Sequence, residues 1–510
     1  MRYAYSVDEV RAAEHAAVTR AGEPALPTGQ LMQRAANALA TVGGRFLGER
    51  GGVYGARVLV LAGSGDNGGD ALYAAARLAQ RGARVDVLAT GKLHEAGWAA
   101  LEAAGGRCFT PGEGDSAGDQ LLFETSDLVL DGLVGIGGRG ALREPAARLA
   151  RLATVAADRT IAVDVPSGVN ASTGDVAGDA VQAAVTVTFG LLKPGLLVQP
   201  GAARAGDVEL IDIGLPRPPA TIELLEDGDV AERLPRPDTR ASKYSRGVLG
   251  VTAGSEVYTG AAVLVVAGAV HLSAGMVRFV SVEHPAEQVR AAHPEAVVTT
   301  IAAGDAEALL AVGRVQAWVA GPGMGTGDDS AAILRAVLGT DLPVLVDADG
   351  LTLLAERDDL RELLRGRTAP TLLTPHAGEF SRLTGQDPDE VARDRLTAGR
   401  AAAADLRVTV LLKGANTVVC SPDGRVRINP TGTSWLATAG SGDVLSGICG
   451  SLLAGGLDAL DAGSVGAYLH GVAGELAPPP FTAPELALAL PAAVRNILNG
   501  ATVDTAGRSS

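Results

Sequence analysis

Two glycine-rich segments of the sequence combine acidic side chains with backbone amides that could bind an anionic ligand. AGSGDNGGDAL (62–72) places Asp66, Asn67 and Asp70 between an apolar run and a helical pattern. Glycines let a ligand approach the backbone closely, and the N-terminus of a helix favours anions. TAGSGDVLSG (438–447) opens another helical pattern, with Asp443 in its first turn. Converging amides beside a carboxylate suit an anion hole with a general base.

Other oxygen-bearing side chains of the first half also follow apolar runs. Asp131 lies in VLDGLVGIG, and Asp164 and Ser167 lie in VDVPSG. A carboxylate at the end of a buried strand must face a crevice, meet a cation or accept hydrogen bonds. Asp131 and Ser167, together with Asn67, offer the oxygen donors that suit a hard cation. The alternatives are aspartates that only cap helices and a glycine turn that only shapes the chain.

The second half has two more candidate positions at predicted strand ends. LLKGANTVV (411–419) puts Lys413 beside Gly414, and a cation next to a glycine turn suits nucleotide phosphates. TPHAGEF (374–380) contributes His376, for which a purely structural role is the alternative. AGPGMG (320–325) is a further turn of the same kind.

These candidates are positioned by an alternation of apolar runs and helical patterns. Two helices are predicted within residues 5–50 and one from 70 to about 81; strands are predicted at 56–63, 84–90, 128–133 and 161–168. A second series starts with a strand at 246–254, and helices are predicted at 258–273 and 442–453. Apolar strands that alternate with helices predict an α/β fold with parallel sheets covered on both faces. Ligands bind at the carboxyl ends of such strands, where the candidates lie.

Length and composition limit the class of protein. A chain of 510 residues exceeds the roughly 250–300 residues of a single core, so at least two domains are expected. Hydrophobic residues make up 47% and charged residues 20%, which argues against disorder. The net charge of −15 disfavours a general nucleic-acid binder.

The cysteines and the apolar segments indicate a cytoplasmic protein. Cys108, Cys420 and Cys449 are far apart and have no CxxC spacing, so neither disulfides nor a zinc site is indicated. The N-terminus has early acidic residues and no apolar core. The most apolar stretch, 261–276, is shorter than the ~20 residues of a membrane helix.

The motifs of both halves resemble those of the NAD(P)H-hydrate repair family. GSGDNGGDA, LDGLVGIG, VDVPSG and TFGLLKPG are similar, in this order, to its epimerase domain, and LPTGQLMQRAANALA (26–40) resembles the helix before them. AGPGMG, TPHAGEF, KGANTV and TAGSGDVLSG are similar to its dehydratase domain. The resemblance implies a Rossmann-like epimerase at 1–215, a linker at 216–240, and a ribokinase-like, ADP-dependent dehydratase at 241–503.

By this resemblance, the first domain interconverts the R and S epimers of hydrated NADH and NADPH (NADHX and NADPHX). Asp164 is then the acid–base candidate, and Lys193 pairs with a phosphate or with Asp164. Asn67, Asp131 and Ser167 hold K⁺. The residues implied in binding the substrate are Asp66, Asn67, Gly68, Gly69, Asp70, Gly135, Ile136, Gly137, Gly138, Arg139, Gly140, Ala141 and Asp164.

The same resemblance implies that the second domain dehydrates the S epimer with ADP and Mg²⁺ and releases AMP and phosphate. Asp443 would be the base on the ring hydroxyl, which attacks the terminal phosphate of ADP. The implied substrate-binding residues are Ala262, Gly325, His376 and Asp443, and the implied nucleotide-binding residues are Lys413, Gly414, Ala415, Asn416, Thr417 and Gly442.

Alternatives remain for each half of the chain. The second half could be a ribokinase-like small-molecule kinase that uses ATP, and the first half could be a binding domain without catalysis. Asp66 and Ala71 replace the family's usual Asn and Gly, which adds a negative charge near the dinucleotide. We also expect a homo-oligomer.

Overall fold

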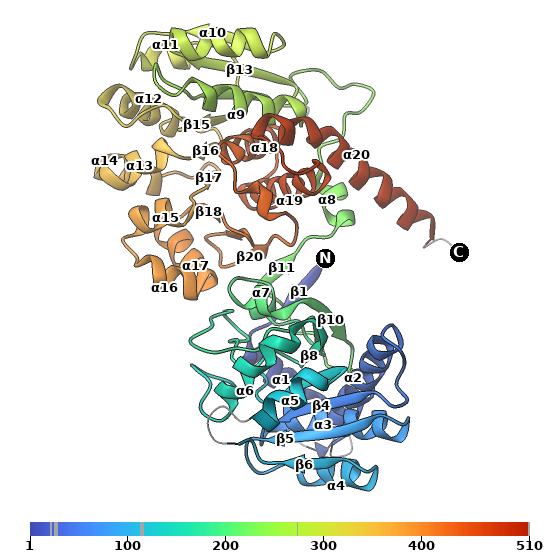
Figure 1. The fold of residues 1–510 in the computed structure, drawn as a ribbon. Coiled ribbons are helices and arrows are strands. Elements are labelled where there is room, and N and C mark those ends of the chain that lie inside the picture. Colours follow the sequence, from blue (N-terminus) through green and yellow to red (C-terminus); the bar gives the residue numbers. More distant parts are fainter. Residues whose placement is uncertain (21–22, 25–28, 113–116, 273, 508–510) are drawn as a thin grey trace. The chain divides into compact units, whose positions relative to one another are not determined.

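The computed structural model describes residues 1–20, 23–24, 29–112, 117–272 and 274–507. The chain forms two compact units, one of Tyr3–Thr221 and one of Ile222–Ser510 together with Met1–Arg2 (Figure 1). Residues 26–28, the start of the segment similar to the family's first helix, lie outside the described residues. No helix in the described ranges is long and apolar enough to cross a membrane.

The N-terminal unit is built on a parallel sheet of seven strands in the order β10-β9-β8-β7-β4-β5-β6. The strands are β4 (Arg57–Ala62), β5 (Arg84–Ala89), β6 (Arg107–Phe109), β7 (Leu128–Gly132), β8 (Thr160–Val163), β9 (Val185–Phe189) and β10 (Asp207–Ile211). The strand order reverses direction between β4 and β7. This is the topological switch point at which open α/β sheets bind ligands.

Helices cover both faces of this sheet because alternate residues of its strands are apolar on both sides. Val58 and Val60 of β4 belong to one core with α1 (Val7–Val18), α2 (Gln30–Gly48), α3 (Asp66–Gln80) and α4 (Glu95–Ala103). Leu59 and Leu61 belong to the other core, with α5 (Ala117–Thr125), α6 (Ala146–Leu152) and the 3₁₀ helix η1 (Ala153–Arg159). The remaining short elements are β2 (Thr19–Arg20), β3 (Glu23–Pro24), η2 (Pro194–Leu196) and α7 (Gly201–Ala205).

The C-terminal unit is built on a sheet with the strand order β1-β11-β20-β19-β18-β17-β16-β15-β12-β13-β14, in which only Arg2 of β1 belongs to this unit. The strands are β1 (Arg2–Ala4), β11 (Ile222–Leu224), β12 (Val248–Thr252), β13 (Met276–Ser281), β14 (Val297–Thr300), β15 (Ala317–Ala320), β16 (Val344–Val346), β17 (Thr371–Leu373), β18 (Thr409–Leu412), β19 (Val418–Cys420) and β20 (Val426–Ile428). The strands from β14 to β18 pair in parallel, whereas β19 is antiparallel to both of its neighbours. The α/β class and the parallel sheets predicted from the sequence are therefore confirmed.

Two layers of helices flank the central strands of this unit (Figure 1). One layer includes α12 (Asp328–Leu338), α13 (Asp349–Glu356), α14 (Asp358–Arg365), α15 (Ala377–Thr384), α16 (Pro388–Arg393) and α17 (Arg395–Leu406). The other includes α9 (Thr259–His271), α18 (Ser441–Ala454), α19 (Ala459–Leu476) and α20 (Ala483–Gly507). The elements α8 (Asp227–Arg233), α10 (Glu283–Ala292), α11 (Ala306–Leu310) and η3 (Ser434–Leu436) complete the unit.

Helices α9 and α18 pack with their backbones in close contact. A Cβ atom at Gly447 would lie 2.0 Å from the carbonyl oxygen of Val265, and one at Gly268 would lie 2.2 Å from that of Val444. Only glycine fits at both positions. This packing fixes α18, whose first turn carries Asp443.

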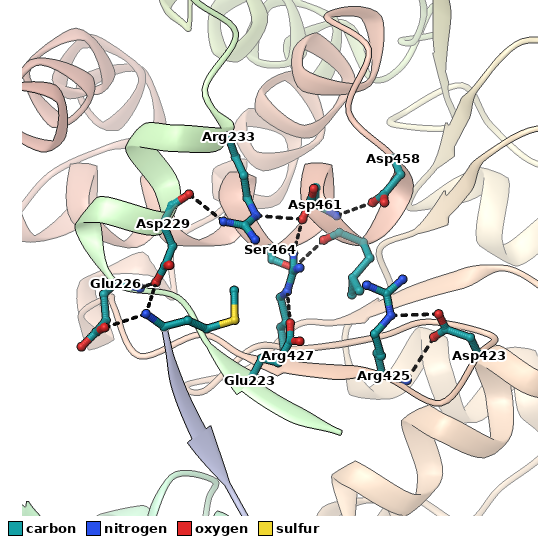
Figure 2. A network of polar contacts seen from close by, with 12 residues as sticks. Glu223, Glu226, Asp229, Arg233, Asp423, Arg425, Arg427, Asp458, Asp461 and Ser464 are labelled. Atoms are coloured by element: carbon teal, nitrogen blue, oxygen red, sulfur yellow. Dashed lines mark hydrogen bonds and ion pairs between the residues drawn. The ribbon is translucent and has the colours of Figure 1, made fainter. Parts of the chain in front are cut away.

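The segment 216–240, expected to be a linker, contains β11 and α8, and ion pairs hold both in the C-terminal unit (Figure 2). Arg427 of β20 is 4% exposed and donates through Nε to Glu223 of β11 over 2.8 Å. It also pairs with Asp461 of α19, which accepts a 3.1 Å hydrogen bond from Arg233 of α8. The ammonium group of Met1 lies 2.7 Å from Asp229.

Candidate active sites

A cavity of about 800 Å³ lies at the carboxyl ends of β4, β7 and β8 in the N-terminal unit. The sequence-predicted residues that line it are Asp66, Asn67, Asp70, Gly135, Ile136, Gly137, Asp164 and Lys193. The glycine loop allows this convergence, since a Cβ atom at Gly63 would lie 1.9 Å from the carbonyl oxygen of Leu133. Gly68 and Gly69 are buried in α3.

Asp164 and Lys193 form a buried ion pair in the wall of this cavity. Lys193 Nζ lies 2.6 Å from Asp164 Oδ1 and also donates to the Thr188 hydroxyl and the Phe189 carbonyl. Asp164 has φ of 66°, a backbone conformation that costs energy for any residue other than glycine. Strain of this kind concentrates at functional sites, and here it orients a carboxylate held by a cation.

Asp131 and Ser167 lie beneath the cavity and bind each other. Both are fully buried, and Asp131 accepts hydrogen bonds from the Ser167 amide over 2.8 Å and the Ser167 hydroxyl over 2.7 Å. Burial raises the pKa of Asp131 to about 6, although the bonds from Ser167 oppose this rise. Asn67 Oδ1 lies near Gly135, since a Cβ atom there would be 2.9 Å from it. The structure thus brings Asp131 and Ser167 into direct contact, and Asn67 contacts the loop that starts at Gly135.

Two further carboxyl groups face the same cavity. Burial, and then the negative charge of Asp164, raises the pKa of Asp70 well above its ordinary value. Burial and Asp164 also raise the pKa of Glu14. Glu14 belongs to α1, and its sequence context carries no glycine motif or strand end that would have singled it out.

The second part of the predicted glycine loop lies in a neighbouring cavity of about 270 Å³. The predicted residues there are Gly138, Arg139, Gly140 and Ala141. Val134 lines both cavities, so the loop from 135 to 141 runs from one into the other.

In the C-terminal unit, a cavity of about 560 Å³ lies at the N-terminus of α18. The sequence-predicted residues that line it are His376, Lys413, Gly414, Ala415, Thr417 and Gly442. Asn416 lies in the same loop, and its Oδ1 atom is buried without a hydrogen-bond partner among the described residues. The predicted anion hole and the predicted cation are thus brought together, since a Cβ atom at Gly442 would lie 3.4 Å from Lys413 Nζ.

Asp443 belongs to an acidic group around Lys413. Lys413 Nζ lies 2.8 Å from Asp347 Oδ1 and 3.9 Å from Glu379 Oε2. Burial, and then the charge of Asp347, raises the pKa of Asp443 to about 7, while Lys413 opposes this rise. Burial by itself would lower the pKa of Lys413, but Asp347 and Glu379 raise it. Asp443 therefore titrates near neutrality, as a general base requires.

Three further predicted residues lie elsewhere in the C-terminal unit or at the edge of this group. His376 accepts hydrogen bonds from the amides of Gly378 and Glu379 and so caps α15. Gly325 has φ of 81° and donates its amide hydrogen to Asp349 over 2.8 Å. Ala262 is fully buried in α9. The described residues include no group of three or more His, Cys, Asp or Glu that could hold a metal by themselves.

The structure adds residues that the sequence interpretation missed. Asp347 is 1% exposed and accepts hydrogen bonds from Lys413 and from the Ser446 hydroxyl. Its segment, PVLVDADG (343–350), has an aspartate directly after an apolar run, the same local signal that marks Asp131. His470 of α19 lines the nucleotide-sized cavity, with Nε2 2.9 Å from the Ser441 carbonyl, and burial lowers its pKa to about 4. No local pattern marks His470.

Two family models match the chain, one for each unit. The model described as YjeF-related protein N-terminus matches residues 28–195. The Carb_kinase model, described as NAD(P)H-hydrate dehydratase, matches residues 249–493. The second match agrees with the ribokinase-like class predicted for this part of the chain.

Relatives of known name match nearly the whole chain. The bifunctional NAD(P)H-hydrate repair enzyme Nnr of Mycobacterium tuberculosis is 49% identical over 465 residues, covering 91% of each chain. The enzyme of the same name from Mycobacterium leprae is 46% identical and covers 93% of this chain and 94% of its own. The ADP/ATP-dependent NAD(P)H-hydrate dehydratase of Bacillus subtilis, crystallised with ATP and Mg²⁺, is 31% identical with a TM-score of 0.49, covering 53% of this chain and 97% of its own. By its identity and coverage against the full-length relatives, this chain belongs to the family of bifunctional NAD(P)H-hydrate repair enzymes.

Proposed function

We propose that this protein repairs hydrated NADH and NADPH in two steps, epimerisation in the N-terminal unit and ADP-driven dehydration in the C-terminal unit. The observation that carries the proposal is the position of Asp443. A carboxyl group with a pKa of about 7 stands at the start of α18, in the same charged group as Lys413. A base and an anion site are thereby placed together, as phosphoryl transfer from a nucleotide requires.

The chemistry of the substrate defines what each site must do. Reduced nicotinamide is an enamine, and water adds to an enamine at the carbon bonded to nitrogen. The hydrate therefore carries its hydroxyl on a stereocentre next to the ring nitrogen. Either face can be hydrated, so both epimers form.

In the N-terminal unit, we assign proton transfer at this hydroxyl to Asp164. Lys193 forms an ion pair with Asp164 in the wall of the cavity. The glycine loop, with Asp66 to Asp70 and Gly135 to Ala141, lines the path on which the rest of the dinucleotide would bind. Four carboxyl groups face the larger cavity, namely Glu14, Asp66, Asp70 and Asp164. We therefore place the uncharged nicotinamide end there, away from the phosphates.

In the C-terminal unit, we assign the base to Asp443. It removes the proton of the ring hydroxyl, whose oxygen attacks the terminal phosphorus of ADP and displaces AMP. The ring nitrogen then expels the phosphate ester, and loss of a proton from the adjacent carbon restores the double bond. Lys413 and the amides at the start of α18 bind the phosphates.

Both sites have donor sets that fit a cation. Three carboxyl groups, Asp347, Glu379 and Asp443, act on the charge of Lys413, and Asp349 in turn acts on Asp443. Mg²⁺ is usually held by one or two carboxylates together with nucleotide phosphates, and it neutralises charge on the transferred phosphoryl group. In the N-terminal unit, Asn67, Asp131 and Ser167 are the proposed ligands of K⁺, which would supply the positive charge that buried Asp131 otherwise lacks.

We also propose that the protein acts in the cytoplasm, where NADH and NADPH occur. We propose that it assembles as a homo-oligomer. Cys108, Cys420 and Cys449 are all free thiols, which supports a reducing compartment.

The test uses a chemically hydrated NADH mixture of both epimers with purified protein, Mg²⁺ and K⁺. ADP should restore the near-ultraviolet absorbance of all the hydrate, faster than spontaneous epimerisation permits. Recovery of one epimer's share alone would contradict the epimerase assignment. Accumulation of a phosphorylated product with ATP, instead of free phosphate, would establish the kinase alternative.

A further inference from the structure

Asp70 is the one carboxyl group of the larger N-terminal cavity with a buried oxygen that lacks a hydrogen-bond partner among the described residues. Its Oδ1 atom is buried, although the cavity lies beside it. Buried carboxyl oxygens without a partner are costly, so such an oxygen indicates that a partner arrives with the ligand. Asn67, one helical turn earlier, has its Nδ2 atom in the same situation.

Asp70 and Asp164 line the same cavity and come from different elements. Asp70 follows β4 in the second turn of α3, and Asp164 follows β8, while β7 lies between these two strands in the sheet. The two groups interact electrostatically, since Asp164 is the neighbouring charge that most raises the pKa of Asp70. The hydroxyl and the ring nitrogen of the hydrate are bonded to the same carbon, so an acid and a base that act on them must line one cavity.

The surroundings of the two carboxyl groups are opposite in character. Asp164 Oδ1 accepts hydrogen bonds from Lys193, Thr188 and the Phe189 amide. Asp70 Oδ1 accepts none among the described residues, and burial together with neighbouring negative charges raises the pKa of Asp70, which favours its protonated form. The titratable groups around the cavity are Arg11, Glu14 and His15 of α1, Asp66 of α3, and Asp164 and Lys193 at the strand ends. Carboxyl groups in such contrasting surroundings commonly divide acid and base roles between them.

We propose that Asp70 is the general acid that complements Asp164 in epimerisation and that it donates a proton to the ring nitrogen of the substrate. This inference rests on the proposed epimerase function and assigns a second catalytic residue to it. Asp164 removes the hydroxyl proton, the carbon–oxygen double bond forms, and the bond between that carbon and the ring nitrogen breaks. The electron pair passes to the nitrogen, which takes the proton of Asp70.

The ring-opened intermediate is an aldehyde with a free enamine N–H. Rotation about the carbon–carbon bond next to the aldehyde presents its other face to the nitrogen. Closure returns one proton from nitrogen to Asp70 and one from Asp164 to the new hydroxyl. Both residues end in their starting states, and no oxidant or further reactant is needed.

The experiment measures interconversion of the purified R and S epimers by chromatography, with the full chain and without ADP, so that dehydration is silent. Asp70→Asn keeps the size and polarity of the side chain but cannot donate an acidic proton. We expect its kcat to fall about 10²- to 10⁴-fold with little change in KM. The wild-type kcat should fall as pH rises through the pKa of Asp70, which gives the pH profile an alkaline limb. This fall in kcat at high pH, the alkaline limb, should be absent in Asp70→Asn.

Glu14→Gln is the matched comparison, because it removes a carboxyl group from another wall of the same cavity. It should retain the alkaline limb. Loss of that limb in Glu14→Gln, or an Asp70→Asn rate within about threefold of wild type, would overturn the proposal. Thermal unfolding of the N-terminal unit, unchanged from wild type, verifies that Asp70→Asn is folded, since dehydration takes place in the other unit. A wild-type protein without epimerisation above the spontaneous rate would instead refute the epimerase function itself.

Discussion

Lys193 Nζ lies 2.6 Å from Asp164 Oδ1, and the Lys193 side chain is only 1% exposed. The lysine is therefore committed to one carboxylate, in a wall of the cavity where Asp164 adopts positive φ. From the sequence, Lys193 could pair with a phosphate or with Asp164; in the structure its ammonium group pairs with Asp164.

Replacing Lys193 by Met should impair both stability and epimerisation. Breaking a buried ion pair typically costs about 3–5 kcal/mol, because the remaining charge is left without a partner. We expect a loss of this size in denaturant unfolding of the N-terminal unit, and an epimerisation rate lower by at least about 100-fold. The double variant Lys193→Met/Asp164→Asn should regain part of the stability. Additive losses in the double variant would show that the two side chains do not interact.

The dehydration rate should depend on the ionisation of Asp443. A base acts in its deprotonated form, so kcat should rise with pH through about 7, the pKa of Asp443, and then level off. Asp443→Asn should abolish this dependence and reduce kcat about 10²- to 10⁴-fold. Calorimetry should show ADP binding preserved. Near-normal turnover by this variant would remove Asp443 from the role of base.

Asp347 should determine the pH at which the dehydration kcat rises, that is, the position of the limb of the pH profile. Its negative charge raises the pKa of Asp443, so Asp347→Asn should move the limb to lower pH. The variant also deprives Lys413 of its 2.8 Å partner, and KM for ADP should change. Ser446→Ala removes a hydrogen bond to Asp347 but not its charge, and should leave the limb in place. An unshifted limb in Asp347→Asn would disprove the electrostatic coupling.

K⁺ should stabilise the N-terminal unit in a pH-dependent way. Burial raises the pKa of Asp131 to about 6, so the group is neutral below this pH and a carboxylate above it. A cation that binds the carboxylate competes with the proton, and its stabilisation grows as pH rises through about 6. Replacing an organic cation by K⁺ at equal ionic strength should raise Tm more at about pH 7.5 than at about pH 5. Asp131→Asn should show no rise, and an equal rise in this variant would place K⁺ elsewhere.

The contact of α9 with α18 should be intolerant of any side chain at Gly447. The Cβ atom of alanine would meet the Val265 carbonyl at 2.0 Å, so Gly447→Ala must displace one helix. Overpacking of this kind costs about 1–3 kcal/mol. Gly260→Ala in the first turn of α9 meets nothing within 4 Å and should be neutral or slightly stabilising. Thermal unfolding of both variants checks this, and equal effects would contradict the close contact.

Local sequence patterns predicted the elements that carry the sites. The helix expected at 442–453 spans Ser441–Ala454, and the strand expected at 84–90 spans Arg84–Ala89. Such segments are predictable because apolar periodicity and glycine turns act over neighbouring residues. Where periodicity was weak, at 216–240, the sequence indicated a linker, whereas β11 and α8 are held there by distant partners such as Arg427 and Asp461.

The sequence by itself determined the α/β class, the family resemblance, and the candidates that follow strands, such as Asp131, Asp164 and Asp443, because these depend on local order along the chain. Only the tertiary structure decided which charged side chains lie next to each other. Lys413 is 66 residues from Asp347, and Glu14 of α1 lines the same cavity as Asp164 at the end of β8. Burial and neighbouring charge set the ionisation of Asp70, Asp131 and Asp443. Both are properties of the packed chain, since the partners come from strands and helices brought together only by folding.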